Sequence, residues 1–235
     1  MAAKLSVVIP AHNEESRLGP TLDRIRAELP DAEILVVDDG SHDGTVELTR
    51  RKRVHVLSYA ENRGKGFALR TGMLAADGER ILFTDADLST PIREVGRLMD
   101  RLGGGFDIAI GSRKMHGSRL IRRQPILRET LGKGFTFLSQ MALGVRVTDF
   151  TCGFKLFTRA CARDLFSRMT IDRWGFDSEI LFLAARRRYR VAEVPVTWCD
   201  DRHTKVKLGR DVLRSLADLA RIRVNAFVGR YRGTP

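Results

Sequence analysis

Short apolar runs alternate with stretches of helical periodicity along the first half of the chain. The runs cover residues 4–10, 32–39, 54–60, 80–84 and 106–111. Between the first two runs, apolar residues recur at the helical spacing of three and four, as Leu18, Leu22, Ile25 and Leu29. Continuously apolar strands that alternate with helices are typical of a parallel sheet covered on both faces. We therefore expect an open, mostly parallel α/β sheet flanked by helices.

Polar residues follow each predicted strand. They are Asn13 and Glu14, Asp38 and Asp39, the segment 62–66, Asp85 and Asp87, and Ser112 and Arg113. In an open α/β sheet, ligands bind beyond the carboxyl ends of the strands. Five polar loops in the same position therefore predict one shared binding crevice rather than five separate solvated turns.

Asp85 and Asp87 form the most informative of these pairs, because two like charges end a buried strand only one residue apart. The plain alternative is an Asx-turn. Mg²⁺ and Mn²⁺ prefer carboxylate oxygens and often share them with substrate phosphates. The position after the fourth strand favours the second interpretation, so we expect a Mg²⁺ or Mn²⁺ site at Asp85 and Asp87.

Other motifs limit the ligands and reactions that the sequence supports. Asp38 and Asp39 could accept hydrogen bonds from a base or a ribose, and the glycine-rich segment 62–66 could offer Lys65 to a nucleotide. No P-loop spacing occurs, and no G-x-G-x-x-G follows the first strand, which disfavours P-loop hydrolysis and hydride transfer. The five histidines lack an i, i+4 pair, and the three cysteines lack metal spacing, so we expect reduced thiols.

Length and charge set further limits. The 235 residues suffice for one domain, no apolar run approaches the length of a membrane span, and no secretory signal opens the chain. Residues 113–135 carry seven Lys and Arg against one acid, and residues 202–232 carry nine against two. Such segments indicate anionic partners: phosphates, an anionic membrane or nucleic acid. Nucleic acid is disfavoured because no DNA- or RNA-binding motif accompanies the charge.

Several motifs together resemble a known family. The segments "VVIPAHNEE", "ILVVDDGSHDGT", "ENRGKGFALRTGM", "FTDADLS" and "IGSR" resemble the nucleotide-sugar half of inverting glycosyltransferases of family 2, which have the GT-A, Rossmann-like fold. "DFTCGFKLFTRACARDLF" and "RWGFDSEILFLAARRRYRVAEVPVTW" resemble the subgroup that glycosylates polyprenyl phosphates, such as the dolichyl-phosphate glucosyltransferases and mannosyltransferases. The resemblance implies a GT-A domain over residues 1–210, with a nucleotide-sugar half (4–113) and an acceptor half (114–210), followed by a basic amphipathic tail (211–235).

The resemblance also implies roles for residues that bind the donor. Binding of the nucleotide-sugar would use Pro10, Ala11, Asn13, Glu14, Asp38, Asp39, Lys65, Asp85, Ala86, Asp87, Arg202 and Lys205. The mannosyl enzymes often carry Gln where this chain has Ser89, so UDP-glucose is favoured over GDP-mannose as donor.

A polyprenyl phosphate acceptor is already ionised at neutral pH, so the site needs positive charge more than a strong base. Arg113 and Arg128 match the acceptor-phosphate arginines of the subgroup, and a guanidinium binds phosphate through two parallel hydrogen bonds. Many relatives carry a catalytic base at the position of Asp177. With a phosphate acceptor, Asp177 could instead orient the acceptor, a loop or an arginine. The predicted catalytic residues are Asp87, Arg113, Arg128 and Asp177.

Two segments are amphipathic. Residues 125–142 place Leu127, Leu131, Phe135 and Leu138 on one helical face, and residues 208–232 carry a similar stripe of Leu213, Leu216, Ala220, Val224 and Phe227. Each face could pack on the core or lie at a membrane surface. We expect a cytoplasmic protein held peripherally at the cytoplasmic face of a membrane, directly or through a membrane-protein partner.

The combined expectation is a metal-dependent inverting transferase that moves a hexose onto a polyprenyl phosphate. Three alternatives stay open from the sequence. They are a GDP-mannose-dependent mannosyltransferase, the same donor with a non-lipid acceptor such as a sugar or phosphoglycerate, and a basic nucleic-acid-binding protein.

Overall fold

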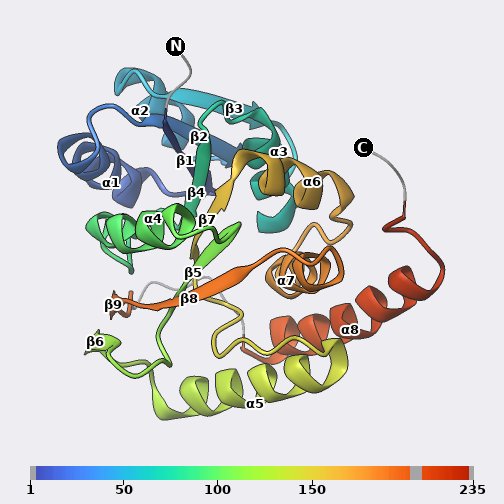
Figure 1. Cartoon of the computed structure of the whole chain (residues 1–235). Coiled ribbons are helices and arrows are strands. Elements are labelled where there is room, and N and C mark those ends of the chain that lie inside the picture. Colours follow the sequence, from blue (N-terminus) through green and yellow to red (C-terminus); the bar gives the residue numbers. More distant parts are fainter. Residues whose placement is uncertain (1–3, 202–207, 233–235) are drawn as a thin grey trace.

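The computed structural model describes residues 4–201 and 208–232, which form a seven-stranded sheet between two layers of helices (Figure 1). The strand order is β3-β2-β1-β4-β7-β5-β8, and β7 alone runs antiparallel to its neighbours. The strands are β1 (Leu5–Ala11), β2 (Glu33–Asp39), β3 (His55–Tyr59), β4 (Arg80–Thr84), β5 (Ile108–Ser112), β7 (Phe154–Thr158) and β8 (Val191–Pro195). Two short strands, β6 (Arg119–Arg122) and β9 (Thr197–Cys199), pair separately. The predicted open, mostly parallel sheet is confirmed.

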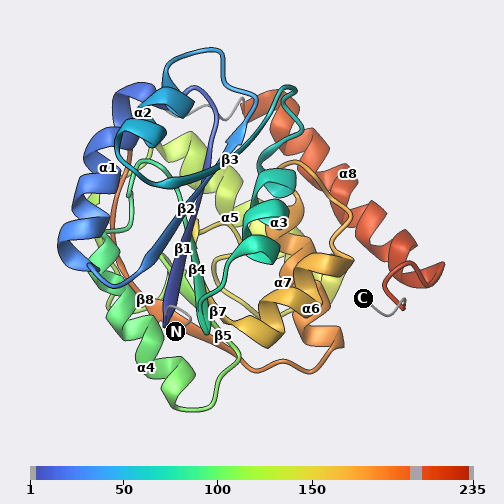
Figure 2. The ribbon, with the colours of Figure 1, turned by 90° about the horizontal axis from the view of Figure 1, so that it is seen from above.

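The helices are α1 (Glu15–Glu28), α2 (Thr45–Arg51), α3 (Lys65–Ala75), α4 (Val95–Gly103), α5 (Ile126–Leu143), α6 (Arg159–Arg168), α7 (Phe176–Arg186) and α8 (Leu208–Phe227), with a 3₁₀ turn, η1 (Ile92–Glu94), before α4. Figure 2 shows α1, α2 and α4 on one face of the sheet and α3, α6, α7 and α8 on the other. Successive strand residues point to opposite faces. Val8 and Phe83 therefore join one core while Val7 and Leu82 join the other. Burial on both faces explains why the strands are apolar throughout.

The topology determines where the polar loops meet. Strands β1, β2, β4 and β5 run parallel or share one antiparallel neighbour, so their carboxyl ends lie at one edge of the sheet. The antiparallel strand β7 begins at this edge, where Phe154 pairs with Thr84. The segment before β7 consequently lies beside the Asp85–Asp87 loop.

The last helix, α8, spans the expected boundary at residue 210 and packs on the domain. Its inner side buries Leu219, Ile222 and Ala226 in the core that α3, α6 and α7 share. The stripe expected from the sequence lies largely on the other side, where Val224 and Phe227 are exposed. The helix is apolar on two sides: one side packs on the core, and the other is exposed. Contact of the exposed side with a membrane stays a prediction.

Helix α5 exposes most of its large apolar side chains. It buries Thr136, Ser139 and, at its end, Leu143. The expected apolar face is mostly exposed, Leu127 at 65% and Leu138 at 45%, and of that face only Phe135 packs against the core. Among the helices within residues 4–201 and 208–232, none is both long and apolar enough to span a bilayer.

The packing of α8 yields a stability prediction. Ile222→Ala should lower the free energy of unfolding by about 2 to 5 kcal/mol, because it leaves a cavity in the core. Val224→Ala, on the exposed side of the same helix, should change it by less than about 0.5 kcal/mol. Urea unfolding of both variants measures the difference. Equal losses would contradict the packing of α8 described above.

Candidate active site

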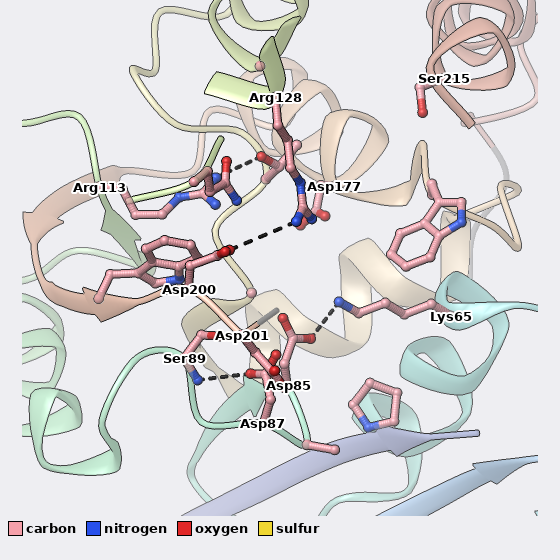
Figure 3. Close-up of a pocket in the computed structure, with 18 of the residues that line it drawn as sticks. Lys65, Asp85, Asp87, Ser89, Arg113, Arg128, Asp177, Asp200, Asp201 and Ser215 are labelled. Atoms are coloured by element: carbon pink, nitrogen blue, oxygen red, sulfur yellow. Dashed lines mark hydrogen bonds and ion pairs between the residues drawn. The ribbon is translucent and has the colours of Figure 1, made fainter. Parts of the chain in front are cut away.

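A cavity of about 730 Å³ opens at the carboxyl ends of the strands, between the two halves of the chain. Most of the residues predicted from the sequence line it. They are Pro10, Ala11, Glu14, Asp39, Lys65, Asp85, Ala86, Asp87, Arg113, Arg128 and Asp177. Asn13, which is exposed, and Asp38, which is buried, are not among the lining residues, and Arg202 and Lys205 fall outside the described residues. Figure 3 shows residues from both halves facing one another across the cavity.

The carboxylates of Asp85 and Asp87 lie together on the floor of the cavity (Figure 3). The ammonium of Lys65, at the start of α3, lies 2.5 Å from Oδ1 of Asp85. Oδ1 of Asp87 accepts a hydrogen bond of 2.8 Å from the backbone N–H of Ser89. Gly153, just before β7, leaves room for Asp85, since any Cβ there would overlap its carboxylate. Three chain segments thus shape one carboxylate pair.

The carboxylate pair fits a divalent cation. Burial and the neighbouring charge of Asp85 raise the pKa of Asp87, so the pair carries a repulsion that a cation would relieve. No group of three or more His, Cys, Asp or Glu side chains that could hold a metal ion occurs in the part of the chain described. A Mg²⁺-type ion commonly uses only one or two carboxylates and completes its shell with water and substrate phosphates. The pair therefore suits a metal that arrives with a phosphorylated ligand.

Asp39 and Asp38, at the end of β2, have different partners. Asp39 accepts hydrogen bonds from the hydroxyl of Tyr59 at 2.8 Å and from the backbone N–H groups of Arg63 and Gly64, so its carboxylate shapes the loop before α3. Asp38 accepts a bond of 3.0 Å from Ser58 through Oδ2, while its buried Oδ1 has no partner within the described structure. Asp38 thus retains an acceptor for a ligand that reaches below the cavity lining.

Asn13 joins the loops after β1 and β2. Its backbone is left-handed, with φ of 53°, and its Oδ1 accepts a hydrogen bond of 2.8 Å from the backbone of His42. Its own N–H donates to the hydroxyl of Ser41 at 2.8 Å. Asn13 therefore connects the loop after β1 to the loop after β2 through two hydrogen bonds.

Arg113 lies on the side of the cavity opposite the carboxylate pair (Figure 3). Its guanidinium donates to both oxygens of Asp149, at 2.7 and 2.8 Å, and to Thr151 at 2.9 Å. Burial alone would raise the pKa of Asp149, but the charge and hydrogen bonds of Arg113 lower it to about 2. Asp149 therefore stays ionised and holds Arg113 in one orientation.

Arg128, from α5, points into the same end of the cavity, where Nη1 lies 3.9 Å from Oδ1 of Asp200 (Figure 3). Leu131 and Phe135, one and two turns further along α5, line the wall beside it. The cavity thus has an anionic floor and, at the far side, two arginines beside an apolar wall.

Asp177, in the first turn of α7, forms an ion pair with the buried Lys155. The ammonium of Lys155, only 1% exposed, lies 2.5 Å from Oδ1 of Asp177 and donates to the carbonyl of Cys152 at 2.7 Å. Burial raises the pKa of Asp177, and the charges of Lys155 and Lys65 oppose that rise. A carboxylate already bound to a buried lysine is suited to orienting neighbours.

Several residues of the site were missed by the sequence reasoning. Asp149 and Lys155 lie in the quoted motif "DFTCGFK", but nothing in their spacing showed which side chains they hold. Others on the cavity wall are Arg17, Trp174, Trp198, Asp200, Asp201 and Ser215. Ser215 comes from α8, and only the three-dimensional packing brings that helix to the cavity.

Comparisons with known proteins converge on one family. The sequence profile of glycosyl transferase family 2 matches residues 6–166. A dolichyl-phosphate β-glucosyltransferase of Drosophila melanogaster is 38% identical, over 97% of this chain and 77% of the relative. The human protein of that name is 34% identical, over 97% of this chain and 78% of the relative.

Solved structures agree on the fold. Glucosyl-3-phosphoglycerate synthase of Mycobacterium tuberculosis with bound UDP superposes with a TM-score of 0.71, at 22% identity, over 94% of this chain and 80% of that one. The same enzyme with Mn²⁺, UDP-glucose and phosphoglyceric acid gives a TM-score of 0.69 at 20% identity, over 99% of this chain and 81% of that one. The predicted GT-A fold is confirmed.

The Arg113–Asp149 pair yields a prediction on pH. The pKa of Asp149, about 2, lies below its ordinary 3.8, so the pair stabilises the fold above pH 4 and loses this effect as the pH falls towards 2. The shift corresponds to about 2 kcal/mol. Asp149→Asn should cost about 3 kcal/mol at pH 7, because it leaves Arg113 unpaired. The gap to the unmodified protein should narrow below pH 4.

Urea unfolding at a series of pH values between 7 and 3 measures this gap. Asp23→Asn is the control, because it removes an exposed ion pair with Lys52 and should cost less than about 1 kcal/mol at pH 7. A gap for Asp149→Asn that stays constant with pH would show that Asp149 does not act through its charge.

Proposed function

Because the chain belongs to glycosyl transferase family 2 and is therefore a glycosyltransferase, we propose that it moves glucose from UDP-glucose, with inversion, onto a polyprenyl phosphate. The observation that carries this proposal is the charge pattern of the cavity. One end has the carboxylate pair Asp85 and Asp87, and the other has Arg113 and Arg128 beside apolar side chains. A metal-bound diphosphate donor matches the first end, and a lipid phosphate matches the second.

The donor assignment rests on the relatives and on the carboxylate end. The relatives named dolichyl-phosphate β-glucosyltransferase supply the sugar, and solved neighbours of the same fold were crystallised with UDP-glucose and Mn²⁺. We assign the nucleoside to the loops of Pro10, Ala11, Asn13, Glu14, Asp38 and Asp39, next to Lys65. A Mg²⁺ or Mn²⁺ ion held by Asp85 and Asp87 would neutralise the leaving diphosphate.

The end of the cavity with Arg113 and Arg128 is suited to a direct displacement by a phosphate acceptor. Arg113 and Arg128 would hold the lipid phosphate, offset its repulsion from the donor and aim one of its oxygens at the anomeric carbon. The bond from that oxygen to the carbon forms as the bond to the UDP oxygen breaks, so the configuration inverts and UDP leaves. A phosphate monoester gives up no proton in this step. The ion-paired Asp177 is consistent with that, because its proposed role is to orient groups around Lys65 and the acceptor.

The exposed apolar face of α5 supports a lipid acceptor over a small one. The residues of this face, called the α5 apolar face below, are Ile126, Leu127, Phe137, Leu138 and Met141. It continues from the wall that carries Arg128, and α8 lies beside it with Val224 and Phe227 exposed (Figure 1). We propose that these helices rest on the cytoplasmic face of a membrane, where the acceptor enters the cavity, with basic side chains near anionic headgroups.

Donor binding is the first test. Calorimetry with UDP-glucose should give binding that depends on Mn²⁺, and GDP-mannose should bind at least about tenfold more weakly, equivalent to about 1.4 kcal/mol. Asp87→Ala should abolish turnover and leave the unfolding curve unchanged, because its carboxylate serves the metal. Tighter binding of GDP-mannose would move the assignment to mannosyl transfer. Full activity in Asp87→Ala would refute the metal site.

Vesicle binding tests the acceptor end. The double variant Phe137→Ser and Met141→Ser should lose most sedimentation with vesicles containing anionic lipids, because each change removes about 2 kcal/mol of apolar burial. Its affinity for UDP-glucose should be unchanged. Leu74→Ser, a change of the same kind on α3, is the control and should sediment normally. Normal sedimentation of the double variant, with transfer to phosphoglycerate intact, would favour the non-lipid acceptor.

A further inference from the structure

Glu179, on α7, is a fully buried carboxylate that the proposed reaction does not use. It accepts hydrogen bonds from the backbone N–H of Thr170 at 3.0 Å, the hydroxyl of Thr170 at 2.6 Å and the backbone N–H of Ile171 at 2.9 Å. The hydroxyl of Tyr231, just after α8, donates a fourth bond of 2.7 Å. All these donors are uncharged. Satisfying a buried carboxyl group in this way fixes every group that takes part.

Helix α8 and the turn after it form three hydrogen bonds with the segment 170–179. Tyr231 reaches Glu179, the amide of Asn225 donates to the hydroxyl of Thr170 at 3.0 Å, and Asp218 accepts from the backbone N–H of Gly175. Asn225 and Asp218 lie on the inner side of α8, among the apolar residues that pack on the core, and Tyr231 follows the helix and is buried. The bonds specify how α8 sits, beyond what apolar packing alone would determine.

The held segment also supports the donor side of the cavity. The carbonyl of Asp172 accepts a hydrogen bond of 3.0 Å from the backbone of Phe67, in the first turn of α3. The backbones are so close that a Cβ on Gly64 would lie 2.5 Å from that carbonyl, and one on Gly66 would lie 2.5 Å from the carbonyl of Ile171. Lys65 lies between these two glycines, so segment 170–173 determines where Lys65 can be.

The same segment carries an aromatic ring into the cavity. Trp174 lines the wall, and the ammonium of Lys65 lies 5.6 Å from the centre of its ring. Lys65 in turn contacts Asp85. A continuous path of contacts therefore runs from the end of α8, through Glu179, to the residues that face the donor.

We infer that Glu179 and Tyr231 are positioning residues for the donor site. Through the hydrogen bonds of Glu179, the end of α8 fixes segment 170–175, and this segment fixes Lys65 and Trp174 against the nucleotide-sugar. The assignment of the ligand rests on the function proposed above, whereas the positioning itself does not. The C-terminal helix is on this account part of the donor-binding machinery.

Tyr231→Phe tests the inference, because it removes one hydroxyl and leaves the ring packed. Tyr189→Phe is the matched control, since the hydroxyl of Tyr189 also donates to a carboxylate, Asp164 at 2.9 Å, away from the cavity. Displacement of Lys65 and Trp174 weakens their contacts with the bound nucleotide-sugar, so we expect Tyr231→Phe to raise the KM for UDP-glucose roughly tenfold. The KM for the acceptor should be unchanged, and Tyr189→Phe should alter neither constant. Equal kinetic effects of the two variants at equal loss of stability would overturn the inference.

Fluorescence provides a readout that does not depend on the donor. The chain has two tryptophans, so Trp198→Phe leaves Trp174 as the only reporter. In that background, without ligand, Tyr231→Phe should increase acrylamide quenching of Trp174, and Tyr189→Phe should not. Unchanged quenching in Tyr231→Phe would overturn the inference. Failure of the unmodified protein to bind any nucleotide-sugar would refute the proposed function, and quenching would still decide whether Tyr231 positions Trp174.

Discussion

Repulsion between the carboxylates of Asp85 and Asp87 is the constraint on which the rest of the cavity depends. The chain meets it with Lys65 on one carboxylate and the Ser89 N–H on the other. Each of these groups comes from a different loop at the carboxyl edge of the sheet, and Gly153 admits Asp85 from the antiparallel strand next to it. The pair therefore has this arrangement only when β4 and β7 are paired in the observed register and α3 is packed beside them. The proposed metal site is in this sense a product of the sheet topology.

Buried ion pairs fix the charged side chains elsewhere in the cavity. The buried Lys155 holds Asp177, which lines the cavity, and Asp149 lies behind Arg113. Compared with apolar side chains of similar volume, such pairs add little net stability, because desolvation offsets their attraction, but breaking one is costly. Their effect is to hold a charge in one orientation. Arg113 can present a fixed guanidinium to an anion only because Asp149 takes up its other donors.

The sequence predicted the parallel strands and the polar loops after them from local patterns. With the motifs that resemble the family, it also predicted eleven of the residues that line the cavity. It could not predict partners that lie far apart along the chain. Asp149 and Arg113 are separated by 36 residues, and Tyr231 and Glu179 by 52. The two apolar sides of α8 were also beyond a periodicity argument, since a helical stripe does not tell which side faces the core. Asn13 and Asp39 were found by pattern, yet much of their hydrogen bonding goes to neighbouring loops.

Helices α5 and α8 combine two demands that normally conflict. Each must pack on the domain, and each exposes large apolar side chains on its other side. Helix α5 resolves this by burying Thr136 and Ser139, whereas α8 adds Asn225 and Asp218 to its inner side and makes directed hydrogen bonds there. Directed bonds keep a helix in one orientation even when both of its sides are apolar, because only one orientation satisfies the buried carboxylate of Glu179. The polar contacts beneath α8 thus account for a helix that can expose an apolar surface and still define the position of Lys65.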